Sequence, residues 1–291
     1  MVTTPAQDTP LCSDALRGPL AGSAKKGEVY VLFEWPGGWS RDVLDGGTFG
    51  PDLSARLKKM LKGTASLQLI RRPGRAGREV GSKHRCYLVW VREARMELLL
   101  IDAPEDLLGL DLTGPGRNGG RLVDTPLVLV CTHGRRDRCC AIKGRPLAAQ
   151  LQEHCPNSVV WETSHTKGHR FAPAMLLMPW AYSFGHLNPE AAGEMVERAL
   201  TGRYFYPGNR GTGLYGPRGQ VAELHVARGL LAVGEDLRYG DLTADDAPEG
   251  AVVVRHRDGR SWRVALHRRE VEGVVASCGG APKTTSVWVA D

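Results

Sequence analysis

The feature that most constrains the fold is an order of predicted elements that occurs twice along the chain. Each copy consists of a strand, a loop, a helix and three further strands, as judged from the spacing of apolar residues. In the first copy we predict a helix at Asp52–Lys62 and strands at Val29–Glu34, Ser66–Arg71, Cys86–Val91 and Met96–Ile101. In the second copy we predict helices at Ile142–His154 and Pro189–Leu200 and strands at Leu127–Cys131, Val159–Glu162, Ala174–Met178 and Trp180–Phe184. Such an order gives one parallel crossover and an antiparallel return, which is typical of a mixed sheet covered by helices.

This order predicts an α/β fold of the thioredoxin-like type, built as two tandem halves. The segments Asp111–Pro126 and Gly202–Gly219 are rich in glycine and are predicted to be linkers, the second with its aromatic residues packed on the sheet. The predicted units are an N-terminal arm over 1–26, a half without ligands over 27–115, a ligand-bearing half over 124–220 and a small C-terminal α+β segment over 221–291. For that last segment we predict a helix at Val221–Leu231 and a hairpin around Asp258-Gly259, between strands Val252–Arg255 and Trp262–Leu266.

The charge and the number of cysteines indicate the cellular compartment and the class of partner. The chain has 291 residues, seven cysteines and a formal net charge of +6. It contains no apolar run of the roughly 18 residues that span a bilayer, and no secretion signal is visible, so we expect a cytoplasmic protein without membrane contact. An odd number of scattered cysteines fits a reducing compartment, where cysteines act as metal ligands or buried thiols. The positive charge alone does not indicate nucleic acid, and we expect none as a partner.

Four potential metal ligands lie close together in the second half. Cys131 ends a predicted strand, Cys140 lies where the next helix begins, and His165 and His169 follow the strand after that helix. Neighbouring parallel strands end at the same rim of a sheet, and the N-terminus of the helix points there and favours thiolates. The pattern therefore predicts that the four side chains converge at one rim.

Two thiols and two imidazoles suit either Zn²⁺ or an iron–sulfur cluster. Structural zinc usually takes cysteines two to four residues apart, whereas eight residues separate Cys131 from Cys140. A longer loop encloses a larger group more naturally. Rieske centres also use two cysteines and two histidines, but they interleave the two residue types within each motif. The spacing thus favours a cluster and leaves zinc as an alternative.

Several short phrases accompany the ligand pattern Cys-x₈-Cys, 24 residues, then His-x-x-Gly-His. These phrases are Phe33-Glu34-Trp35-Pro36-Gly37-Gly38-Trp39-Ser40-Arg41-Asp42, Ile70-Arg71-Arg72-Pro73, Val130-Cys131-Thr132-His133-Gly134, His169-Arg170-Phe171-Ala172 and Ser277-Cys278-Gly279. With the ligand pattern they resemble the sucrase/ferredoxin-like family, and the resemblance extends over most of residues 12–280.

The resemblance implies a thioredoxin-like protein with a [2Fe–2S] cluster in bis-histidinyl, non-Rieske coordination. It implies that Cys131 and Cys140 hold one iron and that His165 and His169 hold the other, which accepts the electron. Relatives commonly have His-x-Gly-Gly-His, and Lys167 replaces the first of these glycines here, which bears on the loop conformation and the local charge. Two neutral imidazoles in place of two thiolates make a cluster less negative, so its reduction potential is expected to exceed that of an all-cysteine ferredoxin.

The function expected from these features is one-electron transfer or redox sensing. No Ser-His-Asp, Walker or dinucleotide-binding motif indicates an enzyme with a substrate of its own. The alternatives are a zinc-stabilised non-redox binding module and a thiol oxidoreductase that uses Cys139 and Cys140. The other cysteines are predicted to be buried small residues, with Cys139 packed behind the loop; they are Cys12, Cys86, Cys155 and Cys278.

Two further features near the ligands carry open alternatives. His133 is expected either to hydrogen-bond a ligand sulfur or to be a plain loop histidine. Basic residues surround both ligand loops, either as a solvated rim or as a surface that docks an acidic redox partner. They are Arg135, Arg136, Arg138, Lys143, Arg145, Lys167 and Arg170.

Overall fold

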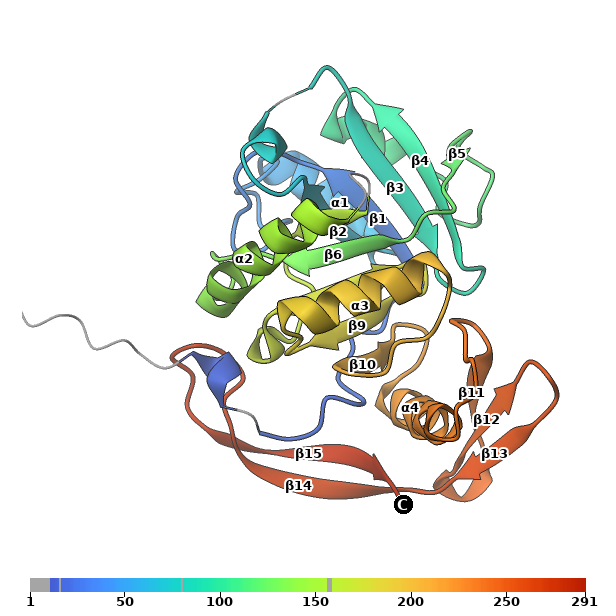
Figure 1. Cartoon of the computed structure of the whole chain (residues 1–291). Helices are drawn as coiled ribbons and strands as arrows, with labels where there is room; N and C mark the ends of the chain where they lie inside the picture. The colour runs from blue at the N-terminus through green and yellow to red at the C-terminus, as the bar shows by residue number, and fades with distance from the viewer. Residues whose placement is uncertain (1–10, 16, 80, 156–158) are drawn as a thin grey trace, which may run out of the picture.

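The first half of the chain forms an α/β unit in the computed structural model, which describes residues 11–15, 17–79, 81–155 and 159–291 (Figure 1). Its elements are β1 (Val29–Glu34), α1 (Pro51–Leu61), β2 (Ser66–Arg71), η2 (Ala76–Arg78), β3 (His84–Trp90), β4 (Arg95–Ile101), η3 (Pro104–Gly109) and β5 (Arg121–Leu122), where η denotes a 3-10 helix. Strand β1 pairs parallel with β2 and antiparallel with β3, which continues antiparallel to β4. Pro51 begins α1, where a missing amide proton costs nothing.

The second half repeats this arrangement. Its elements are β6 (Leu127–Cys131), α2 (Arg138–His154), β7 (Val160–Thr163), η4 (His169–Phe171), β8 (Ala174–Met178), β9 (Tyr182–Gly185), α3 (Pro189–Leu200) and β10 (Asn209–Thr212). Strand β6 pairs parallel with β7 and antiparallel with β8, which continues antiparallel to β9. Each strand of the first half thus has a counterpart with the same neighbours and direction. The predicted α/β class is confirmed, and the structure is consistent with a thioredoxin-like fold.

The two halves share one sheet. Its strand order is β10-β9-β8-β6-β7-β2-β1-β3-β4-β5. The halves meet where β2 and β7 pair antiparallel, through Ile70 opposite Thr163 and Arg71 opposite Glu162. These pairs lie at the carboxyl ends of both strands, so the loops that follow β1, β2, β6 and β7 face one another near the middle of the molecule. The division into separate units at 27–115 and 124–220 stays a prediction.

The C-terminal region packs below the second half (Figure 1). Its elements are α4 (Pro217–Ala232), β11 (Leu242–Asp246), η5 (Pro248–Gly250), β12 (Val252–His256), β13 (Ser261–Val264), β14 (Leu266–Val274) and β15 (Lys283–Ala290). The predicted hairpin is confirmed as β12 and β13, with Gly259 in the left-handed region at its turn. Strands β14 and β15 form a two-stranded ribbon whose far end lies beside η1 (Cys12–Asp14) in Figure 1. The sequence did not predict this ribbon, because its side chains are mostly polar or half exposed.

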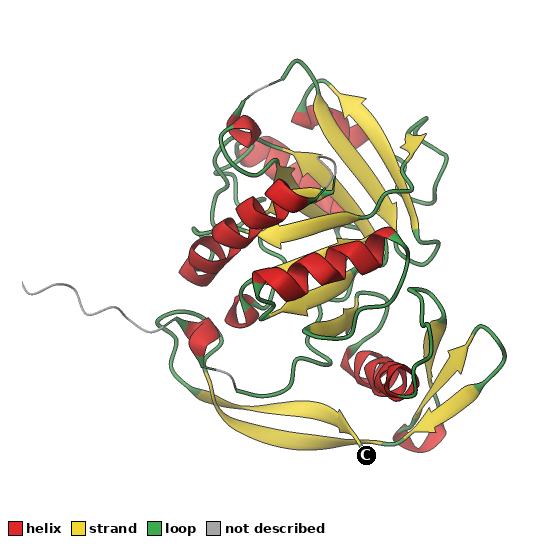
Figure 2. Ribbon diagram, viewed as in Figure 1, coloured by secondary structure: helices red, strands yellow, loops and turns green. Residues whose placement is uncertain are grey.

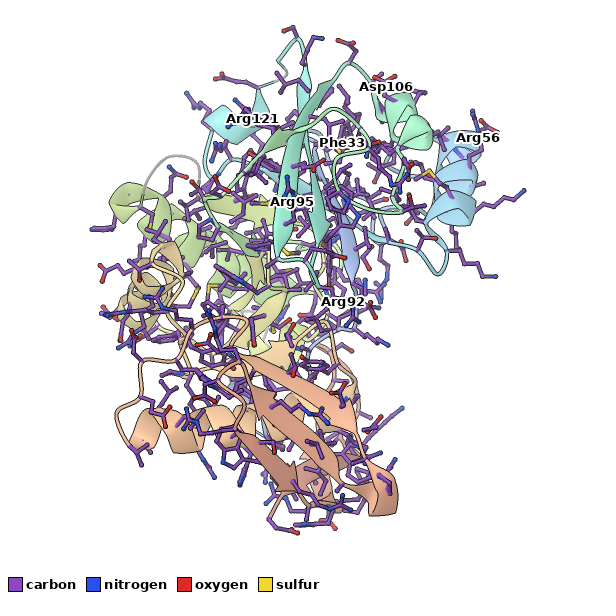
Figure 3. The ribbon with its side chains drawn as sticks, turned by 90° about the vertical axis from the view of Figure 1, so that its right-hand side faces the viewer. Phe33, Arg56, Arg92, Arg95, Asp106 and Arg121 are labelled. Carbon is purple, nitrogen blue, oxygen red and sulfur yellow. The ribbon has the colours of Figure 1, made fainter. Side chains whose placement is uncertain are left out.

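The core follows from the alternation of side chains along each strand. In the first half, Val31 and Phe33 face α1 and η3, and Figure 3 labels Phe33 and shows Arg56 of α1 and Asp106 of η3 on the surface of this layer. In the second half the outer face is covered by α2 and α3, which Figure 2 shows in front of the sheet. The remaining faces of both halves contribute to one shared core, in which the rings of Tyr87 and Trp161 are 5.8 Å apart.

Both predicted linkers contain strands. Strand β5 lies within Asp111–Pro126, and the fully buried β10 lies within Gly202–Gly219. Strand β10 consists of Asn209, Arg210, Gly211 and Thr212, whose polar side chains are hydrogen-bonded inside the protein. The expectation that aromatics of this segment pack on the sheet is met by Tyr204 and Phe205, which are both buried. Among the described residues, no helix has the length and apolar character needed to cross a membrane.

Candidate metal centre

The structure brings the four predicted ligand side chains together at the carboxyl ends of β6 and β7. Cys131 is the last residue of β6 and Cys140 lies in the first turn of α2. His165 follows β7 directly after Ser164, and His169 begins η4. The two sulfurs and a ring nitrogen of His165 lie within 4.8 Å of one another. The ring of His169 is tilted against that of His165, with 5.1 Å between their centroids.

Three imidazole nitrogens of this group are buried and form no hydrogen bond in the part of the chain that the structure describes. Cys131 and Cys140 are fully buried, and the His169 side chain is 15% exposed. Within the described residues, Nδ1 of His165 and both ring nitrogens of His169 accept or donate no hydrogen bond. Buried polar atoms in proteins are nearly always hydrogen-bonded, so three orphaned nitrogens beside two thiols indicate a group that binds them. The donor set therefore fits a metal ion or a metal cluster.

The pKa values of the two thiols are shifted in opposite directions. The Cys140 thiol donates to the Cys131 sulfur and holds the pKa of Cys131 well below its usual range, against the opposing effect of burial. The ring of His165 and the backbone amide of His133 act in the same direction as Cys140. The pKa of Cys140 is raised in turn, because a second buried thiolate beside the first is unfavourable. The lowered pKa of Cys131 favours the thiolate, which is the form of cysteine that binds a metal.

Asp137, directly before α2, and Gly144, within it, set the position of this helix. Asp137 caps the helix, and its carboxylate accepts the amide of Cys139 at 2.9 Å. Gly144 lies against the end of β6, where a β-carbon would overlap the carbonyl oxygen of Cys131. This close approach brings Cys140 to Cys131.

The segment from His165 to His169, the histidine loop, has two consecutive left-handed residues. They are Lys167 with φ of +68° and Gly168 with φ of +81°. Lys167 thus adopts the left-handed conformation that glycine favours and that is strained for a lysine. The buried guanidinium of Arg210 packs against Gly168, where a β-carbon would overlap it, and donates to the carbonyl of Lys167 at 3.2 Å and to that of Ser23. Burial lowers the pKa of Arg210 to about 9.

His133 links the first half to the histidine loop. Its Nδ1 accepts the backbone amide of His165 at 3.2 Å. Its Nε2 therefore carries the proton and donates to the carbonyl of Ser40 at 2.8 Å. Burial lowers the pKa of His133, which keeps this neutral form. Of the two roles predicted for His133, neither describes the ring, because it holds the backbone of a candidate ligand rather than a sulfur. Ser40 was missed in the sequence, although it lies in one of the phrases that resemble the family.

The basic residues around the loops divide into two groups. Lys143 pairs with Asp14 at 2.6 Å, and Arg170 donates to the carbonyl of Arg17 while it packs over the ring of Phe171. The side chains of Lys143 and Arg170 therefore form contacts within the protein. Others remain exposed to solvent, and they are Arg135, Arg145 and Lys167.

A model of the sucrase/ferredoxin-like family matches residues 20–211. The chain belongs to the sucrase/ferredoxin-like family. The matched region contains both halves of the sheet and all four candidate ligands of this family member. Comparison with curated proteins and with solved structures gives no match.

A second group of cysteines lies behind the first in this sucrase/ferredoxin-like protein. Cys12, Cys139 and Cys278 were predicted as separate buried thiols, and the structure brings them together beside Asp137. Cys139 and its neighbour Cys140 therefore face different groups. This separation gives no support to a thiol oxidoreductase that uses the two as a pair. No local pattern in the sequence predicted that these residues meet, because Cys12 and Cys278 lie near opposite ends of the chain and Cys139 lies in its middle.

Proposed function

We propose that this protein is a [2Fe–2S] protein that acts in one-electron transfer or redox sensing. The observation that carries the proposal is the convergence of two buried thiols with two imidazoles, three of whose nitrogens form no hydrogen bond to any residue that the structure describes. Membership of the sucrase/ferredoxin-like family supports it. In this proposal Cys131 and Cys140 hold one iron, and His165 and His169 hold the other.

The bound cluster would supply reversible one-electron chemistry at a raised potential, since two neutral imidazoles replace two thiolates. The protein supplies the surroundings of that chemistry. Burial of Cys131 and Cys140 excludes water from the sulfur side. His133 fixes the backbone of His165, and the half-buried histidines form the side of the site that is less buried than the cysteines. An electron partner is therefore expected to approach from the histidine loop.

One observation favours a second candidate, a single Zn²⁺ ion in a non-redox module. The two sulfurs and the His165 nitrogen lie within 4.8 Å of one another, which is compact enough for one tetrahedral ion. This candidate predicts a colourless protein with no reducible signal.

The test is anaerobic purification followed by iron, sulfide and zinc analysis and by electron paramagnetic resonance of the dithionite-reduced protein. We expect a red-brown protein with two irons and two sulfides per chain and a paramagnetic signal after reduction. His165→Cys and His169→Cys are expected to retain the cluster with a lower potential, because each adds a negative charge. His154→Cys, at an exposed position in the last turn of α2, is the matched control and leaves the signal unchanged. Native protein without acid-labile sulfide would refute the cluster.

We also propose that the basic surface beside His165 docks an acidic redox partner. A cavity of about 240 Å³ opens next to His133 and His165. The cations around it come from both halves and the N-terminal segment, with Asp42 as an acidic neighbour; they are Lys25, Arg41, Arg136 and Lys167. Such a group of like charges attracts anions and raises association rates at low salt.

Two small oxidants of opposite charge test this surface on the reduced protein. Oxidation by ferricyanide is expected to slow as salt rises, whereas oxidation by hexaammineruthenium(III) is expected to accelerate. Arg41→Gln combined with Lys167→Gln should weaken both trends. Arg121→Gln, on the outer edge strand β5 (Figure 3), is the control and should preserve them. Rates that do not change with salt for either oxidant would remove the docking proposal and leave the cluster untouched.

A further inference from the structure

Three cysteines from distant parts of the chain meet behind the candidate centre. Cys12 lies in η1, Cys139 lies in the first turn of α2, and Cys278 lies in the turn between β14 and β15. The sulfur of Cys139 is 3.4 Å from that of Cys12 and 3.1 Å from that of Cys278. The third distance, between Cys278 and Cys12, is 3.8 Å. The three sulfurs thus form a closed triangle.

A carboxylate completes this triangle as a fourth donor. Oδ2 of Asp137 lies 4.0 Å from the Cys12 sulfur and accepts the backbone amide of Cys278 at 3.0 Å. Its other oxygen accepts the amide of Cys139. The carboxylate is therefore held in place from two sides, and its donor atom and the three sulfurs lie within 4.8 Å of one another.

The composition of this group points to a cation. Ordinary buried thiols pack singly against apolar neighbours, whereas here three thiols and an acid contact one another. An odd number of thiols cannot all be paired as disulfides, and all three are free. Cys12 and Cys139 are almost fully buried, as is Asp137. Three sulfur donors and one oxygen donor are a set that binds a soft or borderline divalent ion.

The distances agree with a tetrahedral ion. Zn–S bonds of about 2.3 Å place the sulfurs of a tetrahedral site about 3.8 Å apart. The separations of 3.1, 3.4 and 3.8 Å need only a small outward movement of Cys139 to reach that spacing.

We propose that Cys12, Cys139, Cys278 and Asp137 bind a second metal, a Zn²⁺ ion with a structural role. Binding exchanges the three thiol protons for the ion, and they are released to solvent. The ion would join the N-terminal segment, the end of the β14–β15 ribbon and the start of α2. Figure 1 shows the first two segments side by side at the same end of the molecule. Cys12 and Cys278 lie outside residues 20–211, the region that the family model matches.

The site also contacts the candidate centre through one residue. Oδ2 of Asp137 is 3.5 Å from Nε2 of His169 and forms no hydrogen bond with it. Because Asp137 would bind the ion, the second site would fix the acid that faces His169. The structural metal would thus position part of the ligand shell of the first site.

The test is metal analysis of protein purified without chelators. Wild type is expected to hold one zinc per chain in addition to the metal bound by Cys131 and Cys140. Cys12→Ser and Cys278→Ser should each lose that zinc and retain the other metal. Cys131→Ser should do the reverse, which separates this proposal from the proposed function. Cys155→Ser removes a thiol at the opposite end of α2 and serves as the control that loses neither metal.

A measurement on wild type keeps the proposal testable where a variant does not fold. Zinc X-ray absorption of the native protein is expected to give a first shell of three sulfurs and one oxygen. Zinc surrounded by two sulfurs and two nitrogens would assign the ion to the first site and overturn the proposal. Native protein with no zinc, or zinc that survives both Cys12→Ser and Cys278→Ser, would overturn it as well.

Discussion

A buried acid on α4 makes the stability of the protein depend on pH. Glu223 has no exposed surface, and its Oε1 accepts the hydroxyls of Tyr182 and Tyr204. Its other oxygen has no hydrogen-bond partner among the described residues. Burial raises the pKa of Glu223 to about 7, and the two hydroxyls offset only part of this effect. We therefore predict that Glu223→Gln removes a pH-dependent cost of folding while it keeps an acceptor for both tyrosines.

The size of this cost follows from the two pKa values. The ordinary value is 4.5, and the folded value is about 7. Between them the folded state binds the proton more tightly than the unfolded state, so the free energy of unfolding falls as pH rises. Each pH unit of that difference is worth about 1.4 kcal/mol. Integrated from pH 5 to pH 8, Glu223 lowers the free energy of unfolding by about 2.5 kcal/mol.

Urea unfolding followed by far-ultraviolet circular dichroism at pH 5, 6, 7 and 8 measures this effect. Relative to wild type, Glu223→Gln should gain about 2.5 kcal/mol across that range, and other titrating groups cancel in the comparison. Glu197→Gln, at an exposed position on α3, should follow the wild-type curve. Parallel curves for wild type and Glu223→Gln would refute the reasoning.

Substitutions at Gly144, His133 and Lys167 test the candidate metal centre, with Gly193 as a control. Gly144→Ala should cost about 2–4 kcal/mol and reduce metal content, because its new methyl group must displace the Cys131 carbonyl. Gly193→Ala meets open space on α3 and should be neutral or stabilising in the same urea assay. His133→Ala breaks both ring hydrogen bonds, so it should cost about 2–4 kcal/mol and loosen the histidine loop, seen as faster metal loss to a chelator. Lys167→Gly should keep full metal content, whereas Lys167→Val should lose metal because a β-branched residue is strained at a φ of +68°.

Local signals in the sequence located most of the elements that position the site. The apolar run of Val29–Glu34 and the cap and proline that begin Pro189–Leu200 act over a few residues, and both elements lie where they were predicted. The helix predicted at Ile142–His154 begins four residues earlier, at Arg138. Asp137 supplies a cap there that the apolar spacing does not show. That difference matters, because it places both Cys139 and Cys140 in the first turn.

The elements that sequence reasoning missed depend on contacts between distant residues. Strand β10 is polar, and its Asn209 and Arg210 become buried only because carbonyls from other segments accept their hydrogen bonds. The convergence of Cys131 with the histidines follows from the ends of neighbouring strands and was predictable. The meeting of Cys12 with Cys278 requires the N-terminal segment and a two-stranded ribbon to reach the same helix end, which no local pattern shows.

Because β2 pairs with β7, the half without ligands covers an edge of the half that carries them. At this seam the backbones of β2 and β7 form hydrogen bonds with each other, and Arg71 donates to Glu162 at 2.8 Å. A fragment that begins at residue 124 would present β7 as a bare edge with unpaired amides, and Glu162 would lose Arg71 while it keeps the hydroxyl of Thr132. Bare edges recruit other strands, so such a fragment is expected to self-associate. The ligand-free half therefore acts as a covalently attached second subunit, which protects the edge strand β7 of the ligand-bearing half.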